Sequence, residues 1–228
     1  MIEQQLPPLY DKTIPCPICN KEFSSKKVRS KAIRMEKIEN DFYTEYKDPS
    51  TNPNLYEVYV CPTCGFSFTD QFRKILNNGE KKQFLENVSK NWVSQSFGDA
   101  RSYQEAIHAY KLALLSGMET NQYPVILGGI CLRISWLCRF LHFEEEESRF
   151  VSLALTQYEN SYMEGDFKDT SMSELKLLFF LGVLSKKVGK IENATKYFSK
   201  VVQHKDAERE PIIIDNAREH WYEIRSNK

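Results

Sequence analysis

Hydrophobic residues recur at helical spacing from Gly79 onwards. Phe84, Val88 and Trp92 lie four residues apart, which places them on one face of a helix. Acidic residues 144–147 suit the positive end of a helix dipole, so they are interpreted as a helix start. Six further apolar stripes, separated by short polar breaks, cover residues 103–113, 127–141, 150–158, 175–188, 194–202 and 213–224. Together the seven stripes predict an all-α region of seven helices.

The region before Gly79 has the pattern of strands and turns. Residues 21–23 and 55–60 are typical of strands, and the second segment has the alternation of a half-buried strand. Asparagine and glycine residues just before position 80 break the pattern. We therefore predict an α+β chain that is mostly α, with a small β domain at residues 1–78 and a helical domain at residues 79–228.

Two matched cysteine motifs lie in the β region. They are Cys16-Pro17-Ile18-Cys19 and Cys61-Pro62-Thr63-Cys64-Gly65. A CxxC turn lets two sulfur atoms converge on one ion, and two such turns supply four thiolates in the tetrahedron that Zn2+ favours in structural sites. We therefore predict a zinc ribbon with one zinc ion bound by Cys16, Cys19, Cys61 and Cys64. Gly65 suits the positive φ that the exit of such a turn often needs.

The spacing of the motifs indicates how the site is built. Residues 20–60 separate the two pairs, and an inserted pair of strands would absorb this length. The first histidine is His108, so we expect no mixed cysteine and histidine site in the β region. Four protein ligands leave no open coordination position for catalysis. Cys131 and Cys138 lie seven apart on one apolar helical stripe and are interpreted as buried, inert thiols.

Two other interpretations of the cysteine pairs stay open. One is iron bound by the same four thiolates, as in rubredoxins, which carry one electron. The other is a pair of metal-free redox dithiols. The dithiols are disfavoured because two matched CPxC pairs rarely fall together by accident. The sequence alone does not separate iron from zinc.

Two helical segments share one spacing of small and aromatic residues. The two sets are Ala106, Tyr110, Ala113 and Ala194, Phe198, Val201. The spacing resembles the tetratricopeptide repeat, in which a small residue lies where two helices cross and an aromatic residue packs beside it. Three degenerate helical hairpins are predicted, at residues 80–116, 125–158 and 174–203, with residues 213–224 as a capping helix. A helical bundle without repeats is the alternative.

Several short segments form a recognisable combination with the cysteine pairs. They are residues 9–12, 28–30, 41–42, 52–53 and 59–65, and in the helical half residues 106–107, 110–114 and 132–139. In this combination the chain is similar to a bacterial family known as a domain of unknown function, with a zinc ribbon followed by tetratricopeptide-like helices. The resemblance implies Cys16, Cys19, Cys61 and Cys64 as metal ligands and brings no known activity. Ser135 and Cys138 depart from the family's usual segment and are interpreted as tolerated core changes.

Composition and charge narrow the class of protein. Hydrophobic residues make up 41% and aromatic residues 13% of the chain, enough for a packed core. The 31 basic and 31 acidic residues balance, which argues against coating of nucleic acid or anionic membrane by bulk charge. Residues 1–12 carry no secretory leader pattern, and the apolar stretch at residues 123–132 is too short to span a bilayer. We therefore expect a cytoplasmic protein without membrane contact.

The sequence shows no arrangement typical of an active site. It has no nucleophile beside a base, no paired acid and base, and no glycine loop for phosphate, so we predict a non-enzymatic protein. The first hypothesis is a scaffold or adaptor that binds a protein or peptide in the groove of its helical hairpins. The partner would be held by long polar side chains on the first helix of each hairpin, among them Lys90, Arg133 and Lys176.

Two other functions are considered. In the first, the ribbon binds nucleic acid through basic residues such as Lys26, Lys27 and Arg29, with nearby aromatic residues stacking on bases. A charged, solvated strand face is the simpler explanation of these basic residues. In the second, the chain is a rubredoxin-like electron carrier with iron in place of zinc.

Overall fold

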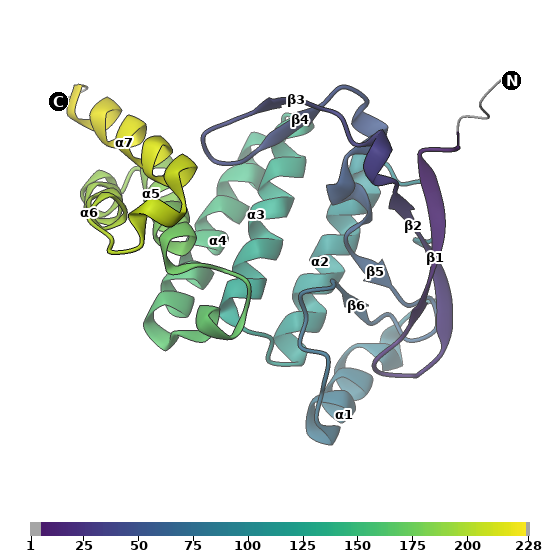
Figure 1. The fold of residues 1–228 in the computed structure, drawn as a ribbon. Coiled ribbons are helices and arrows are strands. Elements are labelled where there is room, and N and C mark those ends of the chain that lie inside the picture. The colour runs from purple at the N-terminus through teal and green to yellow at the C-terminus, as the bar shows by residue number, and fades with distance from the viewer. Residues whose placement is uncertain (1–5, 227–228) are drawn as a thin grey trace, which may run out of the picture. The chain divides into compact units, whose positions relative to one another are not determined.

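The protein is an α+β chain that is mostly α, as the sequence predicted. A computed structural model describes residues 6–226, in which short antiparallel strands come first and seven α-helices follow. By its internal contacts the chain divides into two compact units, Met1–Gln122 and Tyr123–Lys228. The strands, drawn in purple and blue in Figure 1, all belong to the first unit. No helix among residues 6–226 has the length and apolar character needed to cross a membrane.

The strands of the first unit form three two-stranded antiparallel hairpins. The pairs are β1 (Leu9–Pro15) with β2 (Glu22–Val28), β3 (Met35–Ile38) with β4 (Thr44–Tyr46), and β5 (Tyr59–Val60) with β6 (Ser67–Phe68). Each cysteine pair lies at the tip of one hairpin, the first between β1 and β2 and the second between β5 and β6. The pair β3 and β4 is the insertion expected in the long gap between the two motifs.

The strand predicted at residues 55–60 is wrong in its first half. Pro53–Tyr56 forms a 3-10 turn, and only Tyr59–Val60 pairs as a strand. The side chain of Asn52 accepts a hydrogen bond from the backbone N–H of Asn54 at 3.0 Å, and a proline suits the first position of such a turn. Local capping therefore overrides the alternation of apolar residues.

Both helices of the first unit begin with a capping box. They are α1 (Asn78–Asn87), capped by Asn77 with Glu80, and α2 (Tyr103–Glu119), capped by Ser102 with Glu105. In each box the cap side chain accepts from a backbone N–H, and the glutamate accepts from the backbone N–H of the cap residue. Local sequence thus fixes where each helix starts.

The helix expected to continue through Val88 and Trp92 ends earlier. After α1 the residues Ser89–Asn91 form a 3-10 turn, and Trp92 has extended backbone angles. Trp92 leaves the helix because its ring packs against the second cysteine motif, where its indole N–H donates to the carbonyl oxygen of Pro62 at 2.9 Å. Residues 88–102, which join α1 to α2, are called the connector below.

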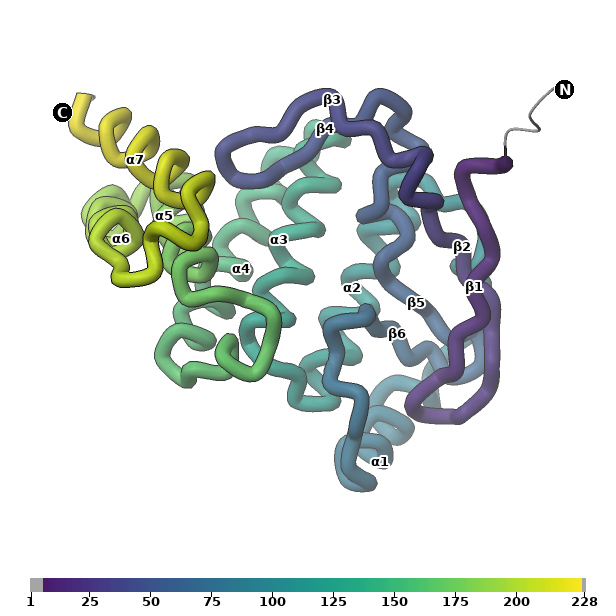
Figure 2. Tube along the Cα trace, in the orientation of Figure 1, coloured from purple at the N-terminus to yellow at the C-terminus, as the bar shows by residue number. Residues whose placement is uncertain are grey.

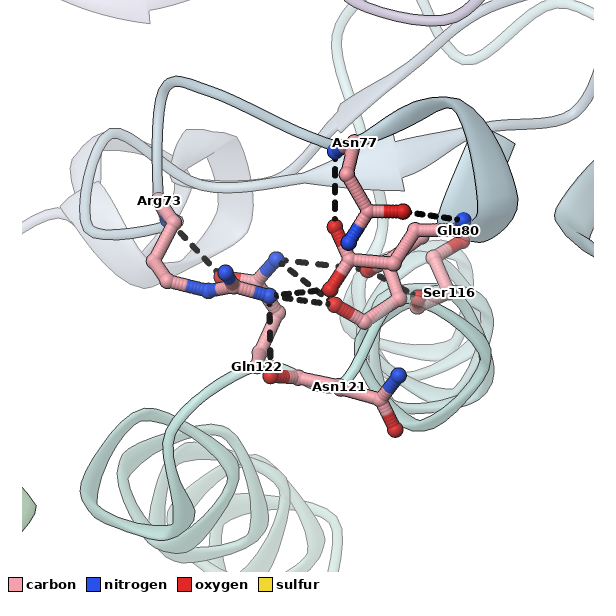
Figure 3. A network of polar contacts seen from close by, with 7 residues as sticks. Arg73, Asn77, Glu80, Ser116, Asn121 and Gln122 are labelled. Carbon is pink, nitrogen blue, oxygen red and sulfur yellow. Dashed lines mark hydrogen bonds and ion pairs between the residues drawn. The ribbon is translucent and has the colours of Figure 1, made fainter. Parts of the chain in front are cut away.

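Along the chain, the boundary between the two compact units follows Gln122, later than the change of pattern at Gly79. Helix α2 packs against β5 and β6, so both helices before residue 122 belong with the strands. Figure 3 shows how the start of α1 is tied to the end of α2: the Arg73 guanidinium bonds Glu80 at 2.6 Å and the carbonyl oxygen of Thr120 at 2.8 Å. The backbone N–H of Arg73 also donates to the side chain of Gln122 at 2.8 Å. A boundary placed from helical periodicity alone overlooks these long-range contacts.

A buried guanidinium joins the connector to both cysteine hairpins of the first unit. Arg101 is only 6% exposed. Its nitrogens donate to the carbonyl oxygens of Phe97 at 2.6 and 2.8 Å, of Val58 at 2.8 Å and of Leu55 at 3.2 Å, and to the hydroxyl of Ser25 at 3.3 Å. Burial lowers the pKa of Arg101 to about 10, so the group stays charged at neutral pH. Since every acceptor is a neutral oxygen, the charge is stabilised by oriented dipoles.

The second unit is built from five consecutive helices. They are α3 (Pro124–Phe140), α4 (Glu144–Glu164), α5 (Glu174–Lys187), α6 (Ile191–Val202) and α7 (Pro211–Ser226). Each helix packs against the next along the chain, and α7 also contacts α5 (Figure 2). Helix α4 begins with four glutamates in its first turn, which confirms residues 144–147 as a helix start.

Close contacts between helices in the second unit are made by glycine and aromatic pairs. A Cβ atom at Gly182 of α5 would lie 2.6 Å from the ring of Phe198 in α6, and one at Gly128 of α3 would lie 2.6 Å from Tyr158 in α4. His220 of α7 stacks on Phe198, with the ring centroids 5.2 Å apart. The small and aromatic positions singled out in residues 174–203 therefore lie inside the unit.

We expect Arg101→Met to destabilise the first unit by on the order of 3 kcal/mol, because several buried carbonyl oxygens lose a charged donor at once. Chemical denaturation of the full chain, followed by near-UV circular dichroism, measures the change. Arg149→Met is the matched control, because the Arg149 side chain is 66% exposed and contacts Glu146 and the ring of Phe150 on its own helix. Equal effects of the two substitutions would show that the Arg101 contacts contribute little.

We expect a fragment of residues 123–228 to fold alone as a helical unit, because its five helices pack against one another. A fragment that starts at residue 79 should carry residues 79–122 in a disordered state, since α2 has lost the strands that it packs on. Amide hydrogen exchange distinguishes the two segments. Strong protection of residues 103–119 in the longer fragment would instead support the boundary near Gly79.

Candidate metal centre

The first cysteine motif forms a tight turn between β1 and β2. The backbone N–H of Cys16 donates to the carbonyl oxygen of Lys21 at 3.0 Å, and the N–H of Asn20 donates to the carbonyl oxygen of Cys16 at 2.9 Å. Asn20 has a φ of +59°. Asparagine is among the few residues other than glycine that adopt this left-handed conformation readily. The turn thus brings the Cys16 and Cys19 side chains to one side.

The second motif repeats this geometry between β5 and β6. The N–H of Cys61 donates to the carbonyl oxygen of Phe66 at 2.9 Å, and the N–H of Gly65 donates to that of Cys61 at 2.9 Å. Gly65 has a φ of +76°, as the sequence predicted. Asn20 therefore occupies the position equivalent to Gly65, and Cys19 the position equivalent to Cys64. Sequence reasoning missed the role of Asn20, although its place directly after the motif was a signal.

The four sulfur atoms of the two turns converge. Sγ of Cys16 lies 3.5 Å from Sγ of Cys64, and Sγ of Cys19 lies 3.7 Å from Sγ of Cys61. All four lie within 4.8 Å of one another. A tetrahedral zinc ion with bonds of about 2.3 Å requires sulfur separations of about 3.8 Å. The predicted residues thus form a possible metal site with the right donor atoms and spacing.

The site is largely shielded from solvent. Cys16, Cys61 and Cys64 are at most 5% exposed, whereas Cys19 is half-buried. All six cysteines are free thiols. Cys131 and Cys138 are buried in α3, outside the four-sulfur cluster, as expected.

The thiols of the cluster influence each other's pKa. The hydrogen bond with Cys64 lowers the pKa of Cys16 to about 5, and the same bond raises the pKa of Cys64. Burial raises the pKa of Cys61 to about 11. A metal ion bound here must therefore displace protons from Cys61 and Cys64, so its affinity falls as the pH falls.

The connector covers the second turn. A Cβ atom at Gly65 would lie 2.5 Å from Cδ2 of Trp92, so only glycine leaves room for the indole. Ser89 donates through its hydroxyl to the carbonyl oxygen of Cys64 at 2.7 Å, and Trp92 donates to that of Pro62. These contacts fix the backbone of the second turn from outside, and helical periodicity gave no signal for them.

Tyr59 joins the two cysteine hairpins. Its hydroxyl donates to Asp70 at 3.0 Å and accepts from Nζ of Lys12 at 3.0 Å. Nζ of Lys27 lies 4.7 Å from the centroid of its ring, a cation–π contact. Burial, together with Asp70, raises the pKa of Tyr59, so its phenol is neutral. Side chains from β1, β2 and β5 are thereby held together.

The three basic residues considered for nucleic acid lie on β2 or directly after it and contact neighbours in the first unit. Nζ of Lys26 pairs with Asp11 at 2.8 Å. Lys27 faces Tyr59, as described above. The guanidinium of Arg29 lies 5.0 Å from the ring centroid of Tyr10 and donates to the carbonyl oxygen of Pro7 at 3.0 Å.

The three residues considered for a protein partner lie on different elements. Lys90 is exposed in the 3-10 turn of the connector, within the first unit. Arg133 is half-buried on α3 and donates to the carbonyl oxygen of Gly129 at 3.2 Å. Lys176 is half-buried in the first turn of α5. The last two therefore lie on the first helices of their hairpins.

Comparison with known proteins places the chain in a family. Neither the curated proteins nor the solved structures gave a significant match. The model of one family, described as "Uncharacterized protein conserved in bacteria (DUF2225)", matches residues 9–224 and so includes both cysteine turns, helices α1 to α6 and most of α7. The chain therefore belongs to this conserved bacterial family.

Proposed function

We propose that the four-cysteine site holds one structural Zn2+ ion and that the protein has no enzymatic activity. The proposal is carried by the sulfur geometry, in which two separations of 3.5 and 3.7 Å match the edge of a tetrahedron of thiolates. Four thiolates fill that tetrahedron, so a bound zinc ion has no position left for a water or substrate molecule. Zinc in such a site supplies a cross-link between the two hairpins.

The second part of the proposal is that the protein acts as a scaffold or adaptor for a protein or peptide partner. The support is the series of helical hairpins α3–α4 and α5–α6, closed by α7, whose glycine and aromatic contacts resemble those of tetratricopeptide repeats. In such series the first helix of each hairpin lines the groove. Arg133 on α3 and Lys176 on α5 are the candidate contacts there. Lys90, in the connector of the first unit, is a separate candidate contact.

Binding of nucleic acid through the ribbon is the less favoured function. Lys26 is neutralised by Asp11, and Lys27 lies 3.5 Å from Asp70. A cation that is already paired contributes less to the release of counterions from a phosphate backbone. Retention on single-stranded DNA with a steep dependence on salt would favour this function over the adaptor.

We expect the full-length protein, purified without chelator, to carry about one zinc ion per chain, because a closed four-thiolate site holds one ion. Elemental analysis measures the content. Less than about a third of an equivalent would count against the site. Iron in place of zinc, with coloured protein, would support the electron carrier instead.

The residue-level control compares two buried thiols. Cys61 is 0% and Cys138 is 1% exposed, so the same change to serine perturbs the packing of each to a similar degree. Cys61→Ser should abolish zinc binding, and Cys138→Ser should leave it unchanged. Loss of zinc in both variants would mean that the metal content reports general unfolding.

We expect a partner identified by affinity capture to lose binding when Lys90, Arg133 and Lys176 are all changed to glutamate, because the contacts proposed for them are reversed in charge. Binding by the purified pair is measured by calorimetry. Far-UV circular dichroism and zinc content should stay unchanged.

The matched control changes Lys74, Lys196 and Lys205 to glutamate, since these lysines are exposed and divide between the units in the same way. Equal loss of binding in both triple variants would point to bulk charge. Binding that survives the first change but disappears when Lys26, Lys27 and Arg29 are reversed would make the ribbon the working surface.

A further inference from the structure

The two cysteine turns have the same backbone geometry but different surroundings. Cys19 and Cys64 occupy equivalent positions, as the hydrogen bonds of the two turns show. Cys64 is 5% exposed, whereas Cys19 is half-buried. The two turns can therefore be compared directly: the second cysteine is covered in one turn and partly exposed in the other.

The cover on the second turn is a set of specific contacts. The Trp92 ring packs on Gly65, its N–H bonds the carbonyl oxygen of Pro62, and the Ser89 hydroxyl bonds that of Cys64. These three contacts, made by two residues of the connector, cover the turn beside Cys64.

In the first turn, the two residues that follow the second cysteine are not covered in this way by the described part of the chain. Asn20 and Lys21, which correspond to Gly65 and Phe66, are both exposed to solvent. Phe66 itself is 1% exposed. Cys19 is therefore the most exposed of the four cysteines.

We infer that Cys19 is the site at which soluble electrophiles and peroxides modify the metal centre, and that Trp92 with Ser89 protects Cys64 from them. The consequence of this modification is release of the ion once a ligand is lost. That consequence rests on the proposed zinc site. Thiolates are the reactive form of cysteine, and reaction at a given thiolate follows its exposure.

With hydrogen peroxide the reaction has two steps. The Cys19 thiolate attacks one peroxide oxygen, an S–O bond forms, the O–O bond breaks, and the leaving hydroxide takes a proton to become water. The Cys61 thiolate, whose sulfur lies 3.7 Å away, then attacks the oxidised sulfur. An S–S bond forms, the S–O bond breaks, and the second hydroxide also becomes water. The two thiolates supply the two electrons that reduce the peroxide.

The test treats zinc-loaded full-length protein with limiting hydrogen peroxide. A chromogenic chelator follows zinc release, and peptide mapping by mass spectrometry locates the modified cysteines. We expect zinc release to follow the loss of the free Cys19 thiol, and the first disulfide to join Cys19 to Cys61. Modification of Cys64 as fast as Cys19 would overturn the inference.

Variants test the protective role of the connector. Trp92→Ala should raise alkylation of Cys64 by iodoacetamide several-fold, whereas Trp221→Ala, a matched tryptophan loss in α7, should leave it unchanged. Ser89→Ala removes one contact only and should have a smaller effect in the same direction, with the zinc content intact at the start. Unchanged reactivity of Cys64 in Trp92→Ala and Ser89→Ala would refute the protective role.

Failure of the zinc proposal would appear separately. If the purified protein carries no zinc, no release of the ion can be measured. The order of alkylation would still be measured, and Cys19 is expected to react before its equivalent, Cys64. The reverse order in metal-free protein would refute the inference itself.

Discussion

The architecture of the first unit depends on one buried cation. Taking a charged group out of water costs several kcal/mol unless polar partners replace the lost hydration. For Arg101 these partners are backbone carbonyl oxygens on the connector and just before β5, together with the hydroxyl of Ser25 on β2. The guanidinium therefore requires three separate segments to meet at one point. Because two of these segments belong to the hairpins that carry the cysteines, Arg101 and the sulfur cluster fix the same pair of hairpins from two places.

Much of this structure could be predicted from the chain's own patterns, and the reasons are local. Apolar spacing identified seven helices because each one buries a continuous stripe. The four cysteines of the candidate site were evident because a CxxC turn needs only nearby residues to direct two sulfur atoms. The inserted pair of strands could be predicted from the length of the segment between the motifs, because this segment must leave the site and return to it.

What the sequence did not reveal depends on contacts between distant residues. Trp92 continues the apolar stripe of α1, yet its ring packs on Gly65, 27 residues earlier in the chain. Periodicity has no information on such a partner. In the same way the helical spacing of α2 says nothing of the strands beneath it, so the compact unit extends to Gln122. Residues 55–58 alternate like a strand, but their carbonyl oxygens serve Arg101 instead of a neighbouring strand.

The contact between Gly65 and Trp92 also constrains how the family can change over time. A side chain at position 65 would meet the indole at 2.5 Å, and a smaller residue at position 92 would leave the second turn uncovered. Neither position can therefore vary freely while the other is kept. Among homologues, the two positions should change together: lineages that lost the aromatic ring are free to replace the glycine, within the limits of its positive φ, and lineages that kept the ring are not.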